Sequence, residues 1–179
     1  MKKELIITAA LSVLSIAVFA QTSDQVTVNI NLYPIQTLEI NAQQKVVNLD
    51  YISEQDYENG VEMDQPDHIN TFSTGGFAIR VNTTNPALSQ PDGESIPSSD
   101  ITITPLIGGT NPLQGASFTT VDLSTEPRVI ISNDSGGINN TFGINYKAKG
   151  NNAYLSKYST ATSSPTLYTT QIIYSMEAR

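Results

Sequence analysis

The first part of the chain alternates apolar and polar residues with a period of two. The apolar members are Val26, Val28, Ile30 and Leu32. This period, with several β-branched residues, predicts a strand that buries one face. Pro34 interrupts the pattern, and a proline in a strand is confined to a sheet edge, a bulge or a strand end. The pattern then resumes through Ile40, so we expect an interrupted first strand.

Similar short patterns recur along the rest of the chain. They predict strands over residues 46–51, 70–73, 77–82, 101–106, 117–123, 128–132, 141–147 and 167–178. Gly75 and Gly76 suggest a hairpin turn between the strands over 70–73 and 77–82, because glycine permits positive φ. One helix is expected near 53–59, where Ser53 and Asp56 resemble a capping box and Gly60 follows as a C-terminal cap. About seven to nine short strands predict an all-β, immunoglobulin-like β-sandwich.

The first twenty residues have the order of a secretory signal. Lys2 and Lys3 precede an apolar run over 5–19, and Ala20 closes a small-residue cleavage site. The run is shorter than the ~20 apolar residues of a spanning helix. We therefore expect a signal peptide over 1–20, a single domain over 21–179, and no membrane span once the signal is removed. The protein would then be exported through the periplasm to the cell surface or beyond.

The charge and the cysteine content of the chain limit which ligands it can bind and how its fold is stabilised. The formal net charge is −8, which disfavours nucleic acid and anionic lipid as ligands. The chain contains no cysteine, so the sandwich must be stable without disulfides. A chain of this length buries enough surface to do so.

Catalytic signatures are missing from the sequence. It has one histidine, His68, and the pattern around it predicts an exposed or edge position. A lone histidine without a nucleophile and an orienting acid signals no relay. Carboxylates are plentiful enough for a glycoside hydrolase pair, but nothing singles out two of them. We expect the protein not to be an enzyme.

Acidic residues concentrate between positions 50 and 67. Calcium binds six to eight oxygen ligands, and the candidates are Asp56, Glu58, Glu62 and Asp64. The alternative, which the pattern favours, is an acidic surface that faces water.

Eight tyrosines in a chain without tryptophan raise the hypothesis of a glycan-stacking platform. The candidates toward the C-terminus are Tyr146, Tyr154, Tyr158 and Tyr168. Tyrosines on strands more often serve packing, and that interpretation is favoured here.

Three stretches carry a resemblance to a known family. They are the V-T-V-N-I-N-L opening, the segment from Phe72 to Val81 and the closing strand from Leu167 to Ser175. Together they resemble small secreted proteins of Bacteroidetes-type bacteria and, in layout, fimbrial subunits of the chaperone–usher kind, particularly spore-coat-U-like pilins.

The resemblance implies an immunoglobulin-like sandwich that assembles by donor-strand exchange with the help of a periplasmic chaperone. The inserting face would be Val26, Val28, Ile30 and Leu32. The strand bordering the receiving groove would carry Tyr168, Ile172, Tyr174 and Met176. Two departures from the family pattern are the absence of cysteine and Ala178 in the place of a penultimate aromatic residue.

Two functions follow as hypotheses. The first is a structural subunit of a fimbria or matrix that pairs with itself or with related subunits through its first strand. The alternative is a secreted glycan- or calcium-binding module of the same fold. Alternation alone also fits a first strand that pairs within its own domain.

Overall fold

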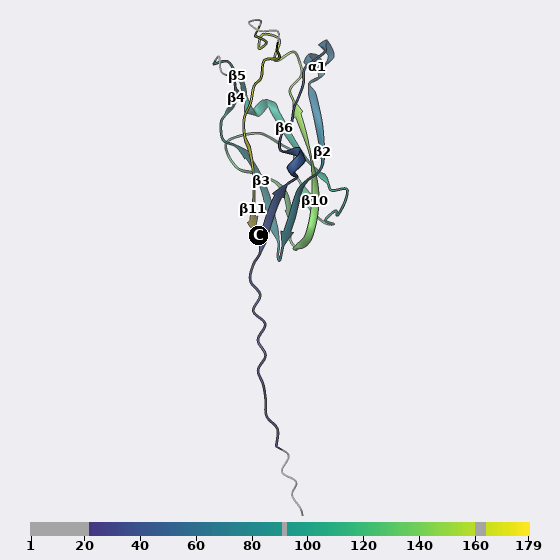
Figure 1. The fold of residues 1–179 in the computed structure, drawn as a ribbon, viewed down its shortest axis with the longest axis vertical. Coiled ribbons are helices and arrows are strands. Elements are labelled where there is room, and N and C mark those ends of the chain that lie inside the picture. The colour runs from purple at the N-terminus through teal and green to yellow at the C-terminus, as the bar shows by residue number, and fades with distance from the viewer. Residues whose placement is uncertain (1–21, 91–92, 160–163) are drawn as a thin grey trace, which may run out of the picture. The chain divides into compact units, whose positions relative to one another are not determined.

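The computed structural model describes residues 22–90, 93–159 and 164–179 (Figure 1). The signal peptide predicted over 1–20 lies outside these ranges. The chain divides into two units at Leu32, an N-terminal segment and a domain over 33–179. The described part of the N-terminal segment, residues 22–32, forms neither helix nor strand.

The domain is built from short strands. They are β1 (Gln36–Ile40), β2 (Val61–Ser73), β3 (Phe77–Thr83), β4 (Ala87–Ser89), β5 (Ser95–Pro97), β6 (Ile101–Ile107), β7 (Ser117–Phe118), β8 (Val121–Asp122), β9 (Arg128–Asn133), β10 (Gly137–Ala148) and β11 (Ile172–Ala178). The helices are η1 (Ala42–Gln44), α1 (Glu54–Asn59) and η2 (Ser98–Asp100), of which η1 and η2 are short 3₁₀ turns.

Two antiparallel sheets form the body of the domain. The five-stranded sheet has the order β1-β2-β10-β6-β8, and the four-stranded sheet has the order β11-β3-β9-β7. β4 and β5 form a separate small pair. This arrangement confirms the predicted all-β, sandwich-like fold.

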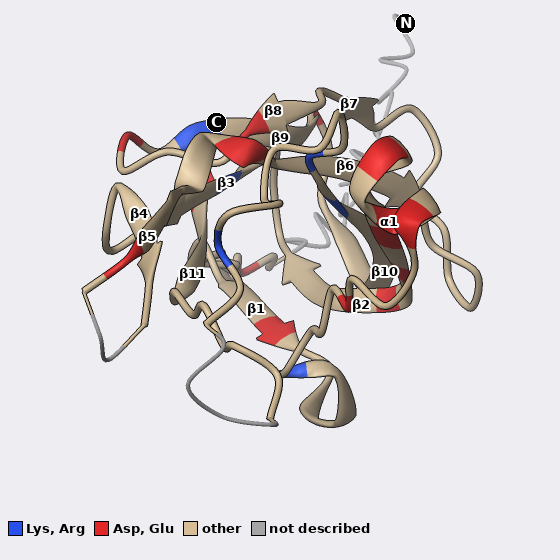
Figure 2. Ribbon diagram, turned by 90° about the horizontal axis from the view of Figure 1, so that it is seen from above, with Lys and Arg blue, Asp and Glu red and all other residues tan. Residues whose placement is uncertain are grey.

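The core lies on the inner faces of the central strands. In β3, Phe77, Ile79 and Val81 are at most 1% exposed, and in β10, Phe142 and Ile144 are fully buried. Each set is spaced by two residues, so the pleat turns all of its members to one face. Figure 2 shows carboxylates spread over several elements, α1, β1 and β8 among them.

Helix α1 forms where the sequence predicts it. The Ser53 hydroxyl accepts a hydrogen bond from the Asp56 amide, and the Asp56 carboxylate accepts from the amides of Ile52 and Ser53. Gly60 ends the helix with a φ of +82°. These backbone amides stabilise the charged form of Asp56 and lower its pKa.

The first predicted strand is present only from Gln36 onward. Residues 22–35 carry no strand, and the side chains of Val26, Val28, Ile30 and Leu32 are 80–88% exposed. The pattern from Val26 therefore marks a strand-like sequence without a partner in the described residues.

Three further expectations need correction. The predicted strand over 46–51 pairs with no sheet, although Val47, Leu49 and Tyr51 do alternate toward the core. Gly75 and Gly76 do not close a hairpin, because β2 and β3 belong to different sheets. The predicted strand over 117–123 is split, and β7 and β8 pair with opposite sheets.

β2 is much longer than the strand predicted over 70–73. It extends back to Val61, through the acidic stretch, and Val61 pairs with Ala148 of β10. The acidic residues concealed this strand because β-pairing needs only backbone groups, and exposed carboxylates do not prevent it. Among the described residues, no helix combines the length and apolar character needed to cross a membrane.

Candidate functional site

The two sheets meet at one side through their edge strands, β1 and β11. These strands lie side by side (Figure 1). Within the described residues, β1 pairs with β2 and β11 pairs with β3, but β1 and β11 do not pair with each other. We call the facing residues of these strands the β1–β11 seam. Its members are Leu38, Ile40, Ile172, Tyr174 and Met176.

The seam covers the core less completely than the inner strands do. All five of its residues pack against the core but remain half-buried, whereas the corresponding residues of neighbouring β3 are fully buried. The alternation of β11 is nevertheless regular, with Ile173 and Ser175 exposed on its outer face. The seam thus presents apolar surface beside two unpaired strand edges, which is the template for another strand.

One end of the domain brings the start of β1 and the end of β11 to the same turn. The Thr74 amide donates to the Ile35 carbonyl at 3.1 Å, and the Ile35 amide donates to the Thr74 hydroxyl at 3.0 Å. The Arg179 amide donates to the Gly76 carbonyl at 3.0 Å. The chain therefore enters β1 and leaves β11 next to the connection between β2 and β3.

A series of hydrogen bonds between buried and half-buried side chains, the hydroxyl–histidine network, lies beneath the seam. The Tyr174 and Tyr146 hydroxyls are 2.6 Å apart, and the Tyr146 hydroxyl is 2.9 Å from His68 Nε2. His68 Nδ1 lies 3.0 Å from Gln44 Oε1. The prediction of an exposed or edge histidine is wrong, since His68 is 2% exposed.

The Gln44 amide fixes which nitrogen of His68 carries a proton in this network. Gln44 Nε2 donates to the Pro66 carbonyl, so Gln44 Oε1 accepts from the Nδ1–H of His68. His68 Nε2 then accepts from Tyr146, which in turn accepts from Tyr174. This order of donors and acceptors belongs to a neutral His68 with its proton on Nδ1, whereas a doubly protonated ring would donate from Nε2 to Tyr146.

Burial shifts the pKa values of His68, Tyr146 and Tyr174. It lowers the pKa of His68 from 6.5 to about 4 and raises the pKa of Tyr146 to about 12. Burial also raises the pKa of the Tyr174 hydroxyl well above its ordinary value. All three groups are thus held neutral at neutral pH, so the network joins the two sheets without a buried charge.

The seam contains three of the four residues predicted to border a groove. Ile172, Tyr174 and Met176 belong to β11, but Tyr168 lies outside it. Tyr168 is half-buried, and its hydroxyl donates to the Lys157 carbonyl at 2.7 Å. The predicted closing strand over 167–178 is therefore shorter at its start.

The predicted inserting face forms no strand. Val26, Val28, Ile30 and Leu32 are all at least 80% exposed. Because transfer of apolar side chains out of water is favourable, burial of this face would stabilise the segment.

The proposed calcium ligands do not converge. Asp56 caps α1, Glu62 approaches Lys147 at 3.8 Å, and Asp64 accepts from the Asn145 amide group at 2.7 Å. Glu58 is exposed on α1. The described ranges contain no cluster of three or more His, Cys, Asp or Glu side chains that could hold a metal ion.

The tyrosines do not form a common platform. Tyr146 and Tyr154 are buried in the core at 3% and 8% exposure, whereas Tyr158 is half exposed. Tyr154 instead packs edge-on against Tyr51, with ring centroids 5.2 Å apart.

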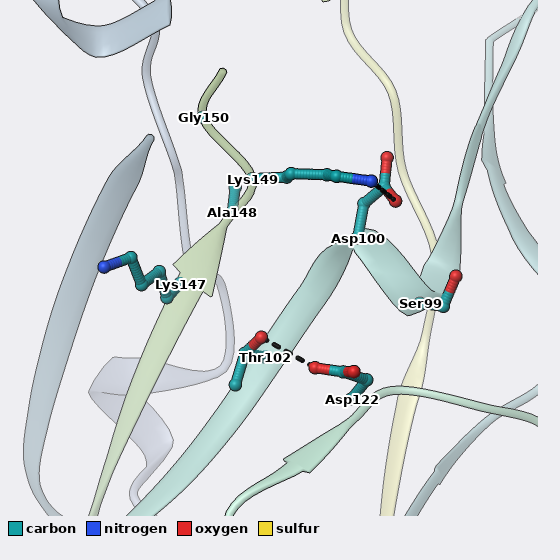
Figure 3. Close-up of a pocket in the computed structure, with 8 residues that line it drawn as sticks. All are labelled: Ser99, Asp100, Thr102, Asp122, Lys147, Ala148, Lys149 and Gly150. Atoms are coloured by element: carbon teal, nitrogen blue, oxygen red, sulfur yellow. Dashed lines mark hydrogen bonds and ion pairs between the residues drawn. The ribbon is translucent and has the colours of Figure 1, made fainter. Parts of the chain in front are cut away.

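An open pocket of about 350 Å³ lies where β6 begins and β10 ends (Figure 3). Figure 3 shows Lys149 reaching across to Asp100, at 3.3 Å, while Lys147 points away from that pair. The Thr102 hydroxyl donates to Asp122 at 2.8 Å. Because these groups bond to one another, the pocket offers a ligand little unsatisfied polarity.

No model of a known protein family matches the chain, and no curated protein matches it either. The functional argument consequently rests on the residues of the chain itself.

Proposed function

We propose that the chain is a non-enzymatic structural subunit of a fimbria or extracellular matrix. In this proposal, residues 26–32 of one copy pair with the β1–β11 seam of the next. Related subunits could exchange strands in the same way, and a periplasmic chaperone would cover the seam before assembly. The observation that carries the proposal is an exposed, alternating apolar segment in a chain whose own sheets leave two edges open.

The dimensions of the two surfaces agree. The segment from Val26 to Leu32 has seven residues, and β11 also has seven. Both alternate with a period of two, so four inward side chains can meet the half-buried side chains of the seam. A strand of this length can satisfy the free backbone groups of β11 along its whole edge.

Burial of the apolar face is a favourable term for assembly. Burying four Val, Ile or Leu side chains contributes roughly 6–12 kcal/mol before the costs of association. Ordering the segment and losing translational freedom offset a considerable part of this gain. Because each subunit offers one segment and one seam, the contact is heterologous and propagates into a filament.

The rest of the chain is compatible with this role. The predicted signal peptide would deliver the protein to the periplasm, and strand addition is a recognised mode of subunit assembly there. The glycan- and calcium-binding alternative receives less support, because its candidate residues are dispersed or buried.

Oligomeric state tests the proposal. The chain beginning at Gln21 is compared by light scattering with one that lacks residues 21–32 and with the variant Ile30→Asp. We expect concentration-dependent assemblies from the first protein and monomers from the other two. Thr27→Asp, on the polar face of the segment, is the matched control and should still assemble. A first protein that stays monomeric at every concentration would refute the proposal.

A further inference from the structure

We infer that the connection Tyr33–Pro34–Ile35 prevents residues 26–32 from folding back onto the seam of their own chain, so that a second copy must supply the strand. This inference rests on the proposed function and adds the reason why the segment does not pair with the seam of its own chain. It starts from the geometry at the beginning of β1.

The last residue before β1 is already fixed to the sheet. Ile35 exchanges two hydrogen bonds with Thr74, one position beyond the first β1–β2 pair, Gln36 with Ser73. The chain thus continues the direction of β1 through Ile35. To return along β1 or β11, it would have to reverse within Tyr33 and Pro34.

These two residues are poorly suited to a tight reversal. Two-residue hairpins use type I′ or II′ turns, which need positive φ at the first or at both central residues and favour Gly, Asn or Asp. Proline fixes φ near −65°, and it holds the preceding residue in the extended region. A type VI turn with Pro34 as its second central residue would need a cis Tyr33–Pro34 bond, which is the less stable isomer of an X–Pro bond.

A three-residue loop meets a similar obstacle. It would place Ile35 in the left-handed region, which is a strong outlier for a β-branched residue. It would also break both bonds between Ile35 and Thr74. The residues of the connection therefore disfavour a return of the segment to its own sheet, which leaves pairing with another copy.

The decisive variant gives the connection the residues that a hairpin needs. Tyr33→Asn with Pro34→Gly places Asn-Gly, the strongest two-residue hairpin signal, directly before Ile35. We expect this protein to be monomeric by light scattering. Its thermal unfolding midpoint should lie roughly 5–10 °C above that of the chain lacking residues 21–32, because its own segment now covers the seam.

Two controls and a second test variant distinguish self-insertion from other effects. Thr22→Asn with Ser23→Gly adds the same residues outside the connection, and Pro34→Ala removes the proline without supplying a turn. Both should assemble like the unaltered chain. An insertion of Asn-Gly between Leu32 and Tyr33 repeats the test in a second sequence, should the double substitution impair folding.

The outcomes separate this inference from the proposed function. If the unaltered chain assembles and both Asn-Gly variants assemble equally well, the inference is wrong and the proposed function stands. If the unaltered chain is a monomer that loses stability when residues 21–32 are removed, the segment folds back, and both the inference and the proposed function are wrong. A monomer whose stability does not change on that deletion refutes the proposed function itself.

Discussion

The hydroxyl groups of Tyr146 and Tyr174 lie 2.6 Å apart and join β10 of one sheet to β11 of the other. Among the described residues, β11 pairs with β3 alone, so this bond is a direct polar tie between the seam and the opposite sheet. Through His68 and Gln44, the tie continues to the turn that follows β1. The two edge strands of the seam are thus connected through the core beneath them.

Removing the middle hydroxyl should destabilise the domain. Tyr146→Phe leaves the Tyr174 hydroxyl and His68 Nε2 without their partner, and an unsatisfied buried polar group costs about 1–3 kcal/mol. Tyr174→Phe removes only the end of the network and should cost about 1 kcal/mol. Urea unfolding at pH 7.5 measures both losses. Tyr33→Phe, at an exposed hydroxyl, is the control, and equal effects of all three substitutions would contradict this account.

Stability should fall as the pH drops from about 6.5 to about 4. An unfolded histidine takes up a proton near pH 6.5, whereas burial delays protonation of folded His68 until about pH 4. Protons therefore favour the unfolded state in this window, and the free energy of unfolding should decrease by about 2 kcal/mol between pH 7.5 and pH 5. His68→Gln should lack this slope. His68 is the chain's one histidine, so an NMR titration of its ring reports the folded-state pKa directly, and a value near 6.5 would contradict the account.

Asp67 should act in a separate, more acidic window. Its carboxylate accepts hydrogen bonds from the Gly109 amide and from the amide and hydroxyl of Thr110, and hydrogen bonding holds its pKa at about 2. Stability from this group is present above pH 3.8 and is lost as the pH falls toward 2. Asp67→Asn should cost about 1 kcal/mol at pH 7, a modest value because the side chain is half exposed. Exposed Asp50→Asn is the control for urea unfolding, and an equal loss there would exclude a specific role for Asp67.

Gly60, at the end of α1, and Gly93, in a distant loop, allow backbone strain to be separated from steric overlap. Both have positive φ, +82° and +89°, but a Cβ on Gly60 would overlap the Ala148 carbonyl, whereas a Cβ on Gly93 meets nothing within 4 Å. Gly93→Ala should cost about 1 kcal/mol through backbone strain alone. Gly60→Ala should cost clearly more, because β10 must shift. Thermal unfolding compares the two variants, and equal midpoints would show that the close approach is unimportant.

Residue patterns predicted the central parts of the fold well. The strand around Ile103 was predictable because its residues alternate over a buried face, and the strands around Ile131 and Ile144 were predictable because they contain β-branched residues. Capping residues located α1, since Ser53, Asp56 and Gly60 act through local hydrogen bonds. The long start of β2 was missed because its exposed Glu62 and Asp64 conceal the alternation, and its pairing with β10 is set by residues more than eighty positions away.

The candidate site was only partly predictable. The sequence indicated Ile172, Tyr174 and Met176, since their spacing is regular, and it identified the apolar face of Val26 to Leu32. It could not reveal that β1 and β11 leave the core half covered, which depends on how two sheets meet. His68 was misjudged because its partners, Tyr146 and Gln44, come from distant elements. The unusual number of tyrosines was the one available signal for a buried hydroxyl network.

The most direct test of strand insertion uses the segment as a separate peptide. A peptide of residues 22–33 is added to the chain lacking residues 21–32, and the thermal unfolding midpoint is measured as the peptide concentration rises. We predict a progressive increase, because the peptide binds only the folded seam. A peptide of the same composition with its alternation scrambled should have no effect. If the native and scrambled peptides leave the midpoint equally unchanged, the seam does not accept this strand and the central claim is wrong.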